Sequence, residues 1–468
     1  MSRINTNIGS LQAMTTLGKN QADLSTRLQR LSSGLKINSG KDAPAALIAS
    51  ETLRSEINGL HQAIDNTGRA NNVINTAEGA LSEVSALLLE VQGLTNEAAN
   101  KGALSSEEIK ANQLQVDSIL NSVNRIANTT QFNGVKLLNG SLDYATSGVT
   151  STAIDVAEVN ALKLPDNGYS TVTVEVTASA QLGEVQFSGT DVGTSAVTVE
   201  VAGNDGTEQL SFAANTATSA VAFAINQLKG STGVSALVSG SVLRFTSTSY
   251  GSDQFVSLKT INGTFQNGKD FGVDAGVNIN GSKADVKGLT ASVRSGDFDV
   301  SLTLDRSFAQ TVSTAGTSFN VVSGGAKFQI GSQVNRQGQI NIGLGSVSTT
   351  KLGNEVDGFL SSISSGGANS LVGGNAIQAQ KILTNAIRQV ATLRGRLGAL
   401  QKNVLDTNQN SLQTALENVT ASESAIRDAD FADETSKLTR AQILVQANTS
   451  VLAQANSSPQ SVLSLLGG

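Results

Sequence analysis

The sequence contains no cysteine and no tryptophan, and it has only one histidine and three prolines among 468 residues. Aromatic residues make up 4% of the chain, so its cores must be built from aliphatic side chains, which suits helical seams and thin sheets better than a large enzyme core. An H-E-x-x-H zinc site needs two histidines, and His61 is the only one in the sequence. A single histidine and no cysteine also give poor support to Ser-His or Cys-His catalysis. These absences predict a protein that is not an enzyme and has no cofactor or metal.

The chain also lacks an excess of positive charge and any long apolar run. Its net charge is −6 and its pI is near 5.1, which disfavours nucleic acid or an anionic membrane as a partner. No run of 18 apolar residues occurs, so no membrane-spanning helix is expected. Residues 1–7 lack the apolar region of a cleavable secretion signal, which taken alone predicts a cytoplasmic protein.

What the chain does have is a seven-residue apolar repeat near each end. Near the C-terminus the repeat consists of Phe431, Leu438, Val445 and Leu452. Near the N-terminus it consists of Leu17, Leu24 and Leu31, with Leu28 and Leu35 at interleaved positions. A helix with such a seam needs a partner of the same period. We therefore predict that the terminal segments pair as a coiled coil and carry the contacts for self-assembly.

Further helices are predicted inside these two ends. A long helix is predicted over about residues 45–100, with a seam at Leu53, Ile57, Leu60 and Ile64. Another is predicted from about residue 375 to 419, with a seam at Leu383, Val390, Leu397 and Val404. An S-x-x-E capping box at Ser105 opens a third helix, and Asn133-Gly134 predicts a hairpin after it. The last helix is expected to stop before Pro459.

Residues 141–374 have a different texture, rich in Gly, Ser, Thr and Val with period-two alternation, as at Val172, Val174 and Val176. This alternation predicts strands. The fold class is therefore α+β, with discontinuous helical domains enclosing a β-rich insertion. We predict five pieces: residues 1–43 and 425–468 form an inner coiled coil, 44–140 and 375–424 form a helical core with the hairpin, and 141–374 form outer domains.

Five short motifs stand out along the chain: RINTN at 3–7, RLSSGLKINS at 30–39, EGAL at 78–81, TQFNGVKLL at 130–138 and PQSVLSLL at 459–466. Together, and in this order, they resemble the motifs of bacterial flagellins. The resemblance covers about 140 N-terminal and 95 C-terminal residues. Short runs between about residues 190 and 260, such as AFAIN at 222–226, are similar to an insert motif of some flagellins and hook-associated proteins.

The resemblance implies a secreted, extracellular subunit of the bacterial flagellar filament that polymerises with copies of itself and serves motility. Flagellins pair their terminal helices, stack them in the inner tubes of the filament and display the middle domain outward. They are exported unfolded without a cleavable signal, and their implied partners are an export chaperone, the filament cap and the hook-junction proteins. A hook-filament junction protein shares both terminal patterns and is the alternative. An adhesive role of residues 141–374 could coexist with assembly.

Before assembly the terminal seams lack neighbouring subunits, and a thin amphipathic pair has little area to offset ordering entropy. We therefore expect residues up to about 40 and beyond about 425 to be disordered in the monomer and to fold on polymerisation.

One departure from the family pattern concerns recognition by the host flagellin-sensing Toll-like receptor. The helix face around residues 89–94 resembles the recognised face and keeps Leu94, but Glu90 replaces an arginine and Gln115 replaces a glutamate. Losing an interfacial charge pair commonly costs about 2 kcal/mol or more, so recognition is expected to be weak. Alternatively, Glu90 serves the packing of this filament.

Two further patterns could suggest ligand sites. Residues 34–41 superficially resemble a phosphate loop, but the spacing is wrong and Asp42 stands where Ser or Thr should bind magnesium. Asp428, Asp430, Asp433 and Glu434 are acidic neighbours that could suggest a metal site, but acidic residues at a helix start normally complement its dipole. Neither pattern is therefore predicted to bind a ligand.

Overall fold

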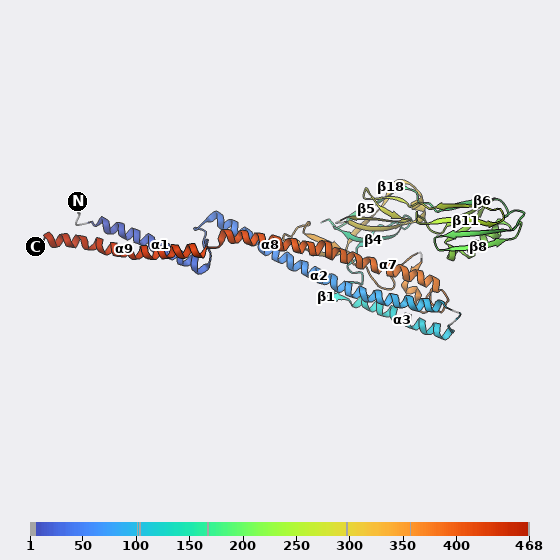
Figure 1. The fold of residues 1–468 in the computed structure, drawn as a ribbon, viewed down its shortest axis with the longest axis horizontal. Helices are drawn as coiled ribbons and strands as arrows, with labels where there is room; N and C mark the ends of the chain where they lie inside the picture. Colours follow the sequence, from blue (N-terminus) through green and yellow to red (C-terminus); the bar gives the residue numbers. More distant parts are fainter. Residues whose placement is uncertain are drawn as a thin grey trace. The chain divides into compact units, whose positions relative to one another are not determined.

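The computed structural model describes residues 6–100, 102, 104–165, 168–295, 298–355 and 357–466 (Figure 1). Arg3, Ile4 and Asn5 of the N-terminal flagellin-like motif lie outside the described residues. The described chain divides into two compact units, the first from residues 1–69, 329–338 and 402–468 and the second from 70–328 and 339–401.

The described helices are α1 (Ile8–Ser33), α2 (Pro44–Ala99), α3 (Ser106–Thr129), α4 (Thr218–Gln227), α5 (Lys229–Thr232), α6 (Arg306–Gln310), α7 (Ala376–Leu400), α8 (Asp406–Arg427) and α9 (Phe431–Leu466). A 3₁₀ turn covers Leu360–Ile363, and a π-helical turn covers Gln401–Leu405.

The described strands are β1 (Gln131–Phe132), β2 (Val135–Lys136), β3 (Ala145–Ser147), β4 (Ile154–Leu162), β5 (Ser170–Ala178), β6 (Glu184–Ser188), β7 (Val197–Gly203), β8 (Thr207–Phe212), β9 (Val234–Ser239), β10 (Val242–Ser247), β11 (Phe255–Asn262), β12 (Gly268–Phe271), β13 (Gly276–Ile279), β14 (Ser282–Lys283), β15 (Asp285–Lys287), β16 (Thr290–Ser295), β17 (Phe298–Leu304), β18 (Ser313–Ser323), β19 (Ala326–Gln329), β20 (Gln339–Ile342), β21 (Gly353–Asn354) and β22 (Gly358–Phe359).

Local sequence signals set several of these boundaries. Gly34 ends α1 in the left-handed conformation, with φ of 71°. Ser105 caps α3 and completes the predicted capping box with Glu108. Asn133 and Gly134 both have positive φ, 52° and 85°, and turn β1 back onto β2 in the predicted hairpin.

The predicted end of the last helix before Pro459 is wrong, because α9 continues to Leu466. A proline inside a helix removes the N–H that would bond to the carbonyl four residues earlier, here that of Ala455. The structure supplies another donor, since Asn7 Nδ2 lies 2.7 Å from the Ala455 carbonyl oxygen. The helix can therefore pass through Pro459 without leaving that acceptor unpaired.

The predicted seam position at Val404 is also wrong. Leu383, Val390 and Leu397 are buried as predicted, but Val404 is 36% exposed and Leu405 is fully buried. The π-helical turn at Gln401–Leu405 inserts one extra residue into the helical ladder, so the next inward position falls one residue later. The helical run also extends past the predicted end near residue 419, to Arg427.

The strands form two hydrophobic cores within the second unit. Sheets β14-β13-β5-β18-β3 and β15-β16-β17-β4 surround one core, in which Val172, Val174 and Val176 are buried as the alternation predicts. Sheets β6-β10-β9 and β12-β11-β7-β8, together with helix α4, surround the other, which centres on Phe245. Helical ends enclosing a β-rich middle confirm the predicted α+β class.

None of the described helices combines the length and the apolar character needed to cross a membrane.

Candidate functional site: the paired terminal helices

Helices α1 and α9 lie side by side and run antiparallel, so that Asn7 at the start of α1 meets Ala455 late in α9 (Figure 1). Most residues of the two predicted seams are half-buried, namely Leu17, Leu24, Leu31, Leu35, Leu438, Val445 and Leu452. Ala13 and Ala441 are buried to 7% and 2% exposure. Small side chains at these positions let two helix backbones approach closely.

Two members of the predicted seams lie elsewhere. Leu28 is 49% exposed and Phe431 is 68% exposed in the single chain. Arg27 and Glu434 occupy the corresponding inward positions, where both side chains are largely buried. Counting back seven residues from Leu438 gives Phe431, which the sequence predicts as a seam residue. In a coiled coil the buried positions alternate by three and four residues, and counting back four from Leu438 gives Glu434.

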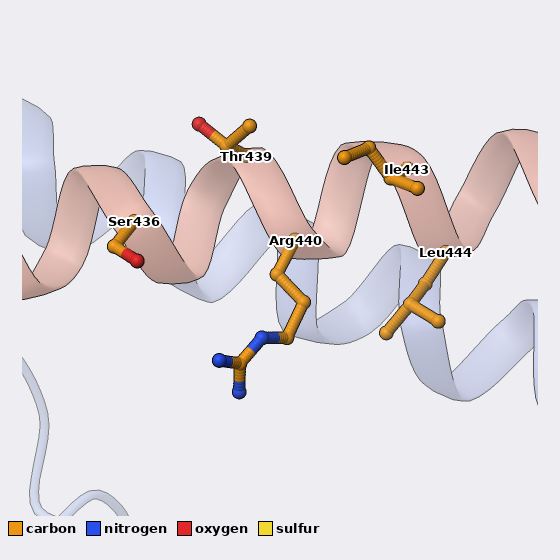
Figure 2. Close-up of a pocket in the computed structure, with 5 residues that line it drawn as sticks. All are labelled: Ser436, Thr439, Arg440, Ile443 and Leu444. Carbon is orange, nitrogen blue, oxygen red and sulfur yellow. The ribbon is translucent and has the colours of Figure 1, made fainter.

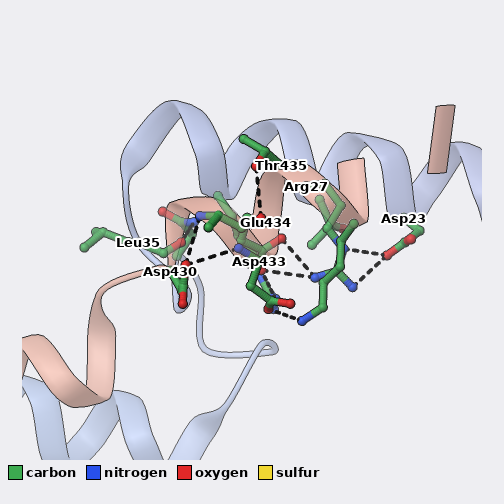
Figure 3. Close-up of polar contacts among 12 residues, drawn as sticks. Asp23, Arg27, Leu35, Asp430, Asp433, Glu434 and Thr435 are labelled. Carbon is green, nitrogen blue, oxygen red and sulfur yellow. Dashed lines mark hydrogen bonds and ion pairs between the residues drawn. The ribbon is translucent and has the colours of Figure 1, made fainter. Parts of the chain in front are cut away.

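A charge cluster joins the two helices at Glu434 (Figure 3). Its carboxylate is 5% exposed and accepts hydrogen bonds from Arg27 Nη1 at 3.1 Å to both oxygens and from Arg30 Nη1 at 3.3 Å. Asp23 braces Arg27 by accepting from its Nε at 3.1 Å. The cluster ties the last turns of α1 to the first turn of α9.

The electrostatics of Glu434 follow from these contacts. Burial alone would raise the pKa of its carboxyl, but the hydrogen bonds and positive charges of Arg27 and Arg30 outweigh burial and hold that pKa below the ordinary glutamate range. Glu434 therefore carries its charge in the folded pair, and the start of α9 adds a favourable dipole.

The other acidic residues of this region also serve local structure. Asp430 Oδ1 accepts from the backbone N–H of Ala432 at 2.9 Å and of Asp433 at 3.1 Å, which caps α9. Asp433 pairs with Lys437, and Asp428 Oδ2 accepts from Ser424 Oγ at 2.5 Å. Among the described residues no group of three or more His, Cys, Asp or Glu side chains is arranged to hold a metal ion.

A short crossing fixes where the chain enters and leaves the pair. Leu35 forms an antiparallel bridge with Asp428, and the Lys36 N–H donates to the Arg427 carbonyl at 2.7 Å. The Ala429 N–H donates to the Gly34 carbonyl at 2.9 Å. Both helices of the pair are therefore anchored at the same end by backbone bonds.

The pair leaves much of its apolar surface uncovered. Ile8, Leu11, Met14, Ile443, Leu444 and Val451 are between 43% and 65% exposed. On α9 a shallow surface pocket is lined by Ser436, Thr439, Arg440, Ile443 and Leu444 (Figure 2). Exposed apolar side chains in this number on a helix pair are typical of surfaces that bind another chain.

The remaining predicted residues lie along α2 and α3. Leu60 is buried, and Leu53, Ile57 and Ile64 are half-buried on α2. The predicted receptor-equivalent positions Glu90 and Gln115 are exposed, and Leu94 is half-buried.

Sequence reasoning missed Arg27, Arg30 and Asn7. A repeat defined by apolar residues leaves out polar residues at seam positions. The signal that could have identified Arg27 and Arg30 is a charged residue at the same helical spacing as the seam leucines. Asn7 stands directly before the first residue of α1, and this position identifies it as a helix cap. The position does not reveal the second hydrogen bond, to the carbonyl of Ala455.

Comparison with known proteins finds three matching family profiles. Residues 4–143 match the bacterial flagellin N-terminal helical region, 380–466 match the bacterial flagellin C-terminal helical region, and 198–249 match the flagellin hook IN motif.

Individual relatives match almost end to end. The chain is 31% identical to flagellin A of Vibrio anguillarum and 30% identical to a flagellin of Salmonella rubislaw, covering 99% of both chains in each case. Among solved structures it is similar to FliC from Burkholderia pseudomallei, with 16% identity, a TM-score of 0.25 and coverage of 71% of this chain and 98% of that one.

Proposed function

The chain belongs to the bacterial flagellin family and is a structural subunit of the extracellular flagellar filament, and we propose that it polymerises through the uncovered faces of α1 and α9. The relatives that it matches end to end are named flagellins rather than hook-associated proteins, which decides between the two alternatives.

The observation that carries the proposed interface is the exposure of large apolar side chains on the outer faces of both terminal helices. Leu11 is 65% exposed and Ile443 is 59% exposed, on helices whose other faces already contact each other. Burying one such side chain contributes about 1.5–3 kcal/mol. A few of them, repeated at every subunit contact, are enough to drive polymerisation.

The test is a double substitution, Leu11→Ser with Ile443→Ser. We expect the critical concentration for filament formation, measured by sedimentation, to rise by more than about tenfold. Val334→Ser is the matched control, because Val334 is 89% exposed but lies outside both helices. Equal critical concentrations for the double variant and the control would refute the proposed interface.

We propose that the domains are assembled from discontinuous pieces, as the sequence predicts: 1–43 with 425–468, 44–140 with 375–424, and 141–374. The contact between α1 and α9 supports the first of these. Because Ala13 is the single buried residue of α1, the terminal pair has little stabilising area of its own, which supports disorder before assembly. Strong hydrogen-exchange protection of α1 and α9 in monomers would contradict this.

Partners beyond the chain itself are inferred from the family. We propose an export chaperone, the filament cap and the hook-junction proteins, and export without a cleavable signal. The exposed apolar side chains of α9 support the proposal of a chaperone. Before assembly they would bind other chains unless a partner covered them. Unchanged export when the exposed apolar residues of α9 are made polar would argue against a chaperone that covers them. An adhesive role of residues 141–374 remains compatible with assembly.

We propose that the flagellin-sensing Toll-like receptor recognises this chain weakly. Glu90 and Gln115 are both exposed, so the altered charges are available to a partner. The alternative is that Glu90 serves contacts within the filament. A receptor reporter assay that gives full potency would exclude weak recognition.

We assign the chain no catalytic activity, because the sequence offers one histidine and no cysteine.

A further inference from the structure

A proline inside α9 leaves one backbone acceptor without its usual donor. In an α-helix the N–H of each residue bonds to the carbonyl four residues earlier, and proline has no N–H. Pro459 lies within the helical span Phe431–Leu466, so the carbonyl of Ala455 loses its partner in the ladder.

The donor that reaches this carbonyl comes from the other end of the chain. Asn7 Nδ2 donates to the Ala455 carbonyl oxygen at 2.7 Å, while Asn7 Oδ1 accepts from the Ser10 N–H at 3.0 Å and caps α1. Both contacts require the same orientation of the amide. Ser10 Oγ adds a second link across the pair, to Asn456 Oδ1 at 2.6 Å.

We propose that Asn7 is a positioning residue that fixes the axial register of α1 on α9 by recognising the one carbonyl that Pro459 frees. If α1 slipped along α9, Asn7 Nδ2 would meet carbonyls already bonded within the helix. This inference rests on the proposed function, because register decides where the exposed apolar side chains of α1 stand along α9 when a neighbouring subunit meets the pair.

The proposal explains why asparagine is needed at position 7. Asn, Asp and Ser cap helices about equally well, because each offers a side-chain acceptor. Ionised aspartate has no donor, and serine would have to accept and donate through a single oxygen, whereas asparagine carries its acceptor and its donor on separate atoms. Asn7→Asp would therefore keep the cap of α1 but place a carboxylate oxygen against the carbonyl oxygen of Ala455.

The experiment is a double-mutant cycle read by the critical concentration of filament formation in the full chain. Asn7→Asp is expected to raise the critical concentration about tenfold, since it removes one hydrogen bond and leaves an acceptor unpaired. In a Pro459→Ala background residue 459 regains its N–H, so the same change should raise it less than about threefold. Gln454→Glu is the control, because it adds the same charge directly beside Ala455 at an exposed side chain that takes no part in these contacts; a change below about twofold is expected.

An equal effect of Asn7→Asp in both backgrounds, or assembly of Asn7→Asp at the native critical concentration, would overturn the proposal. These outcomes are separate from failure of the proposed interface, which is read from the Leu11 and Ile443 variant.

Discussion

Glu434 lies where an apolar side chain would ordinarily fill a coiled-coil seam, and its carboxylate is satisfied by two arginines from α1. A buried ion pair adds little net stability relative to a well-packed apolar residue, because desolvation offsets most of the attraction. Breaking it is costly, however, since a charge is then left without its partner. The cluster therefore favours one alignment of α1 and α9 over others, and Asn7 does the same at the opposite end of α1.

Removing the charge of Glu434 tests this cluster. Glu434→Gln should destabilise the terminal pair by about 1–2 kcal/mol, because Arg27 and Arg30 lose their anion while staying partly hydrated. The measurement is the dissociation temperature of purified filaments. Asp433→Asn is the control, since Asp433 and Lys437 are both exposed and their pair is worth less than about 0.5 kcal/mol. Similar shifts for both variants would show that Glu434 has no special role.

The same residue predicts a dependence on pH. The pKa of Glu434 in the folded pair lies below that of an ordinary glutamate, so its contribution is fully present above the ordinary pKa. It is lost as the pH falls through the lowered pKa. We expect native filaments to lose stability in this acidic window more steeply than Glu434→Gln filaments, as followed by light scattering during acid titration. Parallel titration curves would contradict the assignment.

At the scale of the element, the π-helical turn between α7 and α8 decides which side chains face inward. It rotates everything after Gln401 by one residue relative to a regular α-helix, which replaces Val404 by Leu405 at the buried position. The hydrogen bonds of such a turn have poorer geometry than those of an α-helix. Burial of the Leu405 side chain must therefore offset the loss.

Truncation of each of these neighbours tests the register. Leu405→Ala should lower the free energy of unfolding by about 2–5 kcal/mol, as expected for a fully buried leucine. Val404→Ala should change it by less than about 1 kcal/mol, because Val404 is 36% exposed. Thermal unfolding of the soluble protein measures both. A larger loss for Val404→Ala would mean that the helix keeps α-helical register.

Much of this architecture could be predicted from the sequence. The seven-residue repeats predict the helices, the alternation at Val172, Val174 and Val176 predicts a strand, and the capping box at Ser105 marks a helix start. The failures share a cause. The rules for a regular, isolated helix fail at Val404 because of an inserted residue, and at Pro459 because of a donor from α1.

At the scale of the molecule, the middle region contains an insertion that is closed at its base. Gln181 and Val273 form an antiparallel bridge with two backbone bonds of 2.9 Å each. The core centred on Phe245 is built from residues between these two positions. The buried residues of the other core all come from outside the interval, and Tyr250 is the one residue of the insertion that packs against them as a partly buried neighbour.

This closure predicts that the insertion is dispensable for assembly. Replacing residues 182–272 by a two-residue turn should leave the critical concentration for filament formation within about threefold of native, because bridged ends need little rearrangement to join. Electron microscopy and sedimentation check the result. Loss of filaments from a variant whose helix content is otherwise retained would show that the insertion contributes to polymerisation.

The measurement that addresses the central claim most directly is filament formation by a chain that ends at residue 428. This variant lacks all of α9 and therefore the partner of α1, the Glu434 cluster and the surface pocket around Ile443. The account predicts that it stays unpolymerised at every concentration at which the native chain forms long filaments. Long filaments of the shortened chain would contradict it.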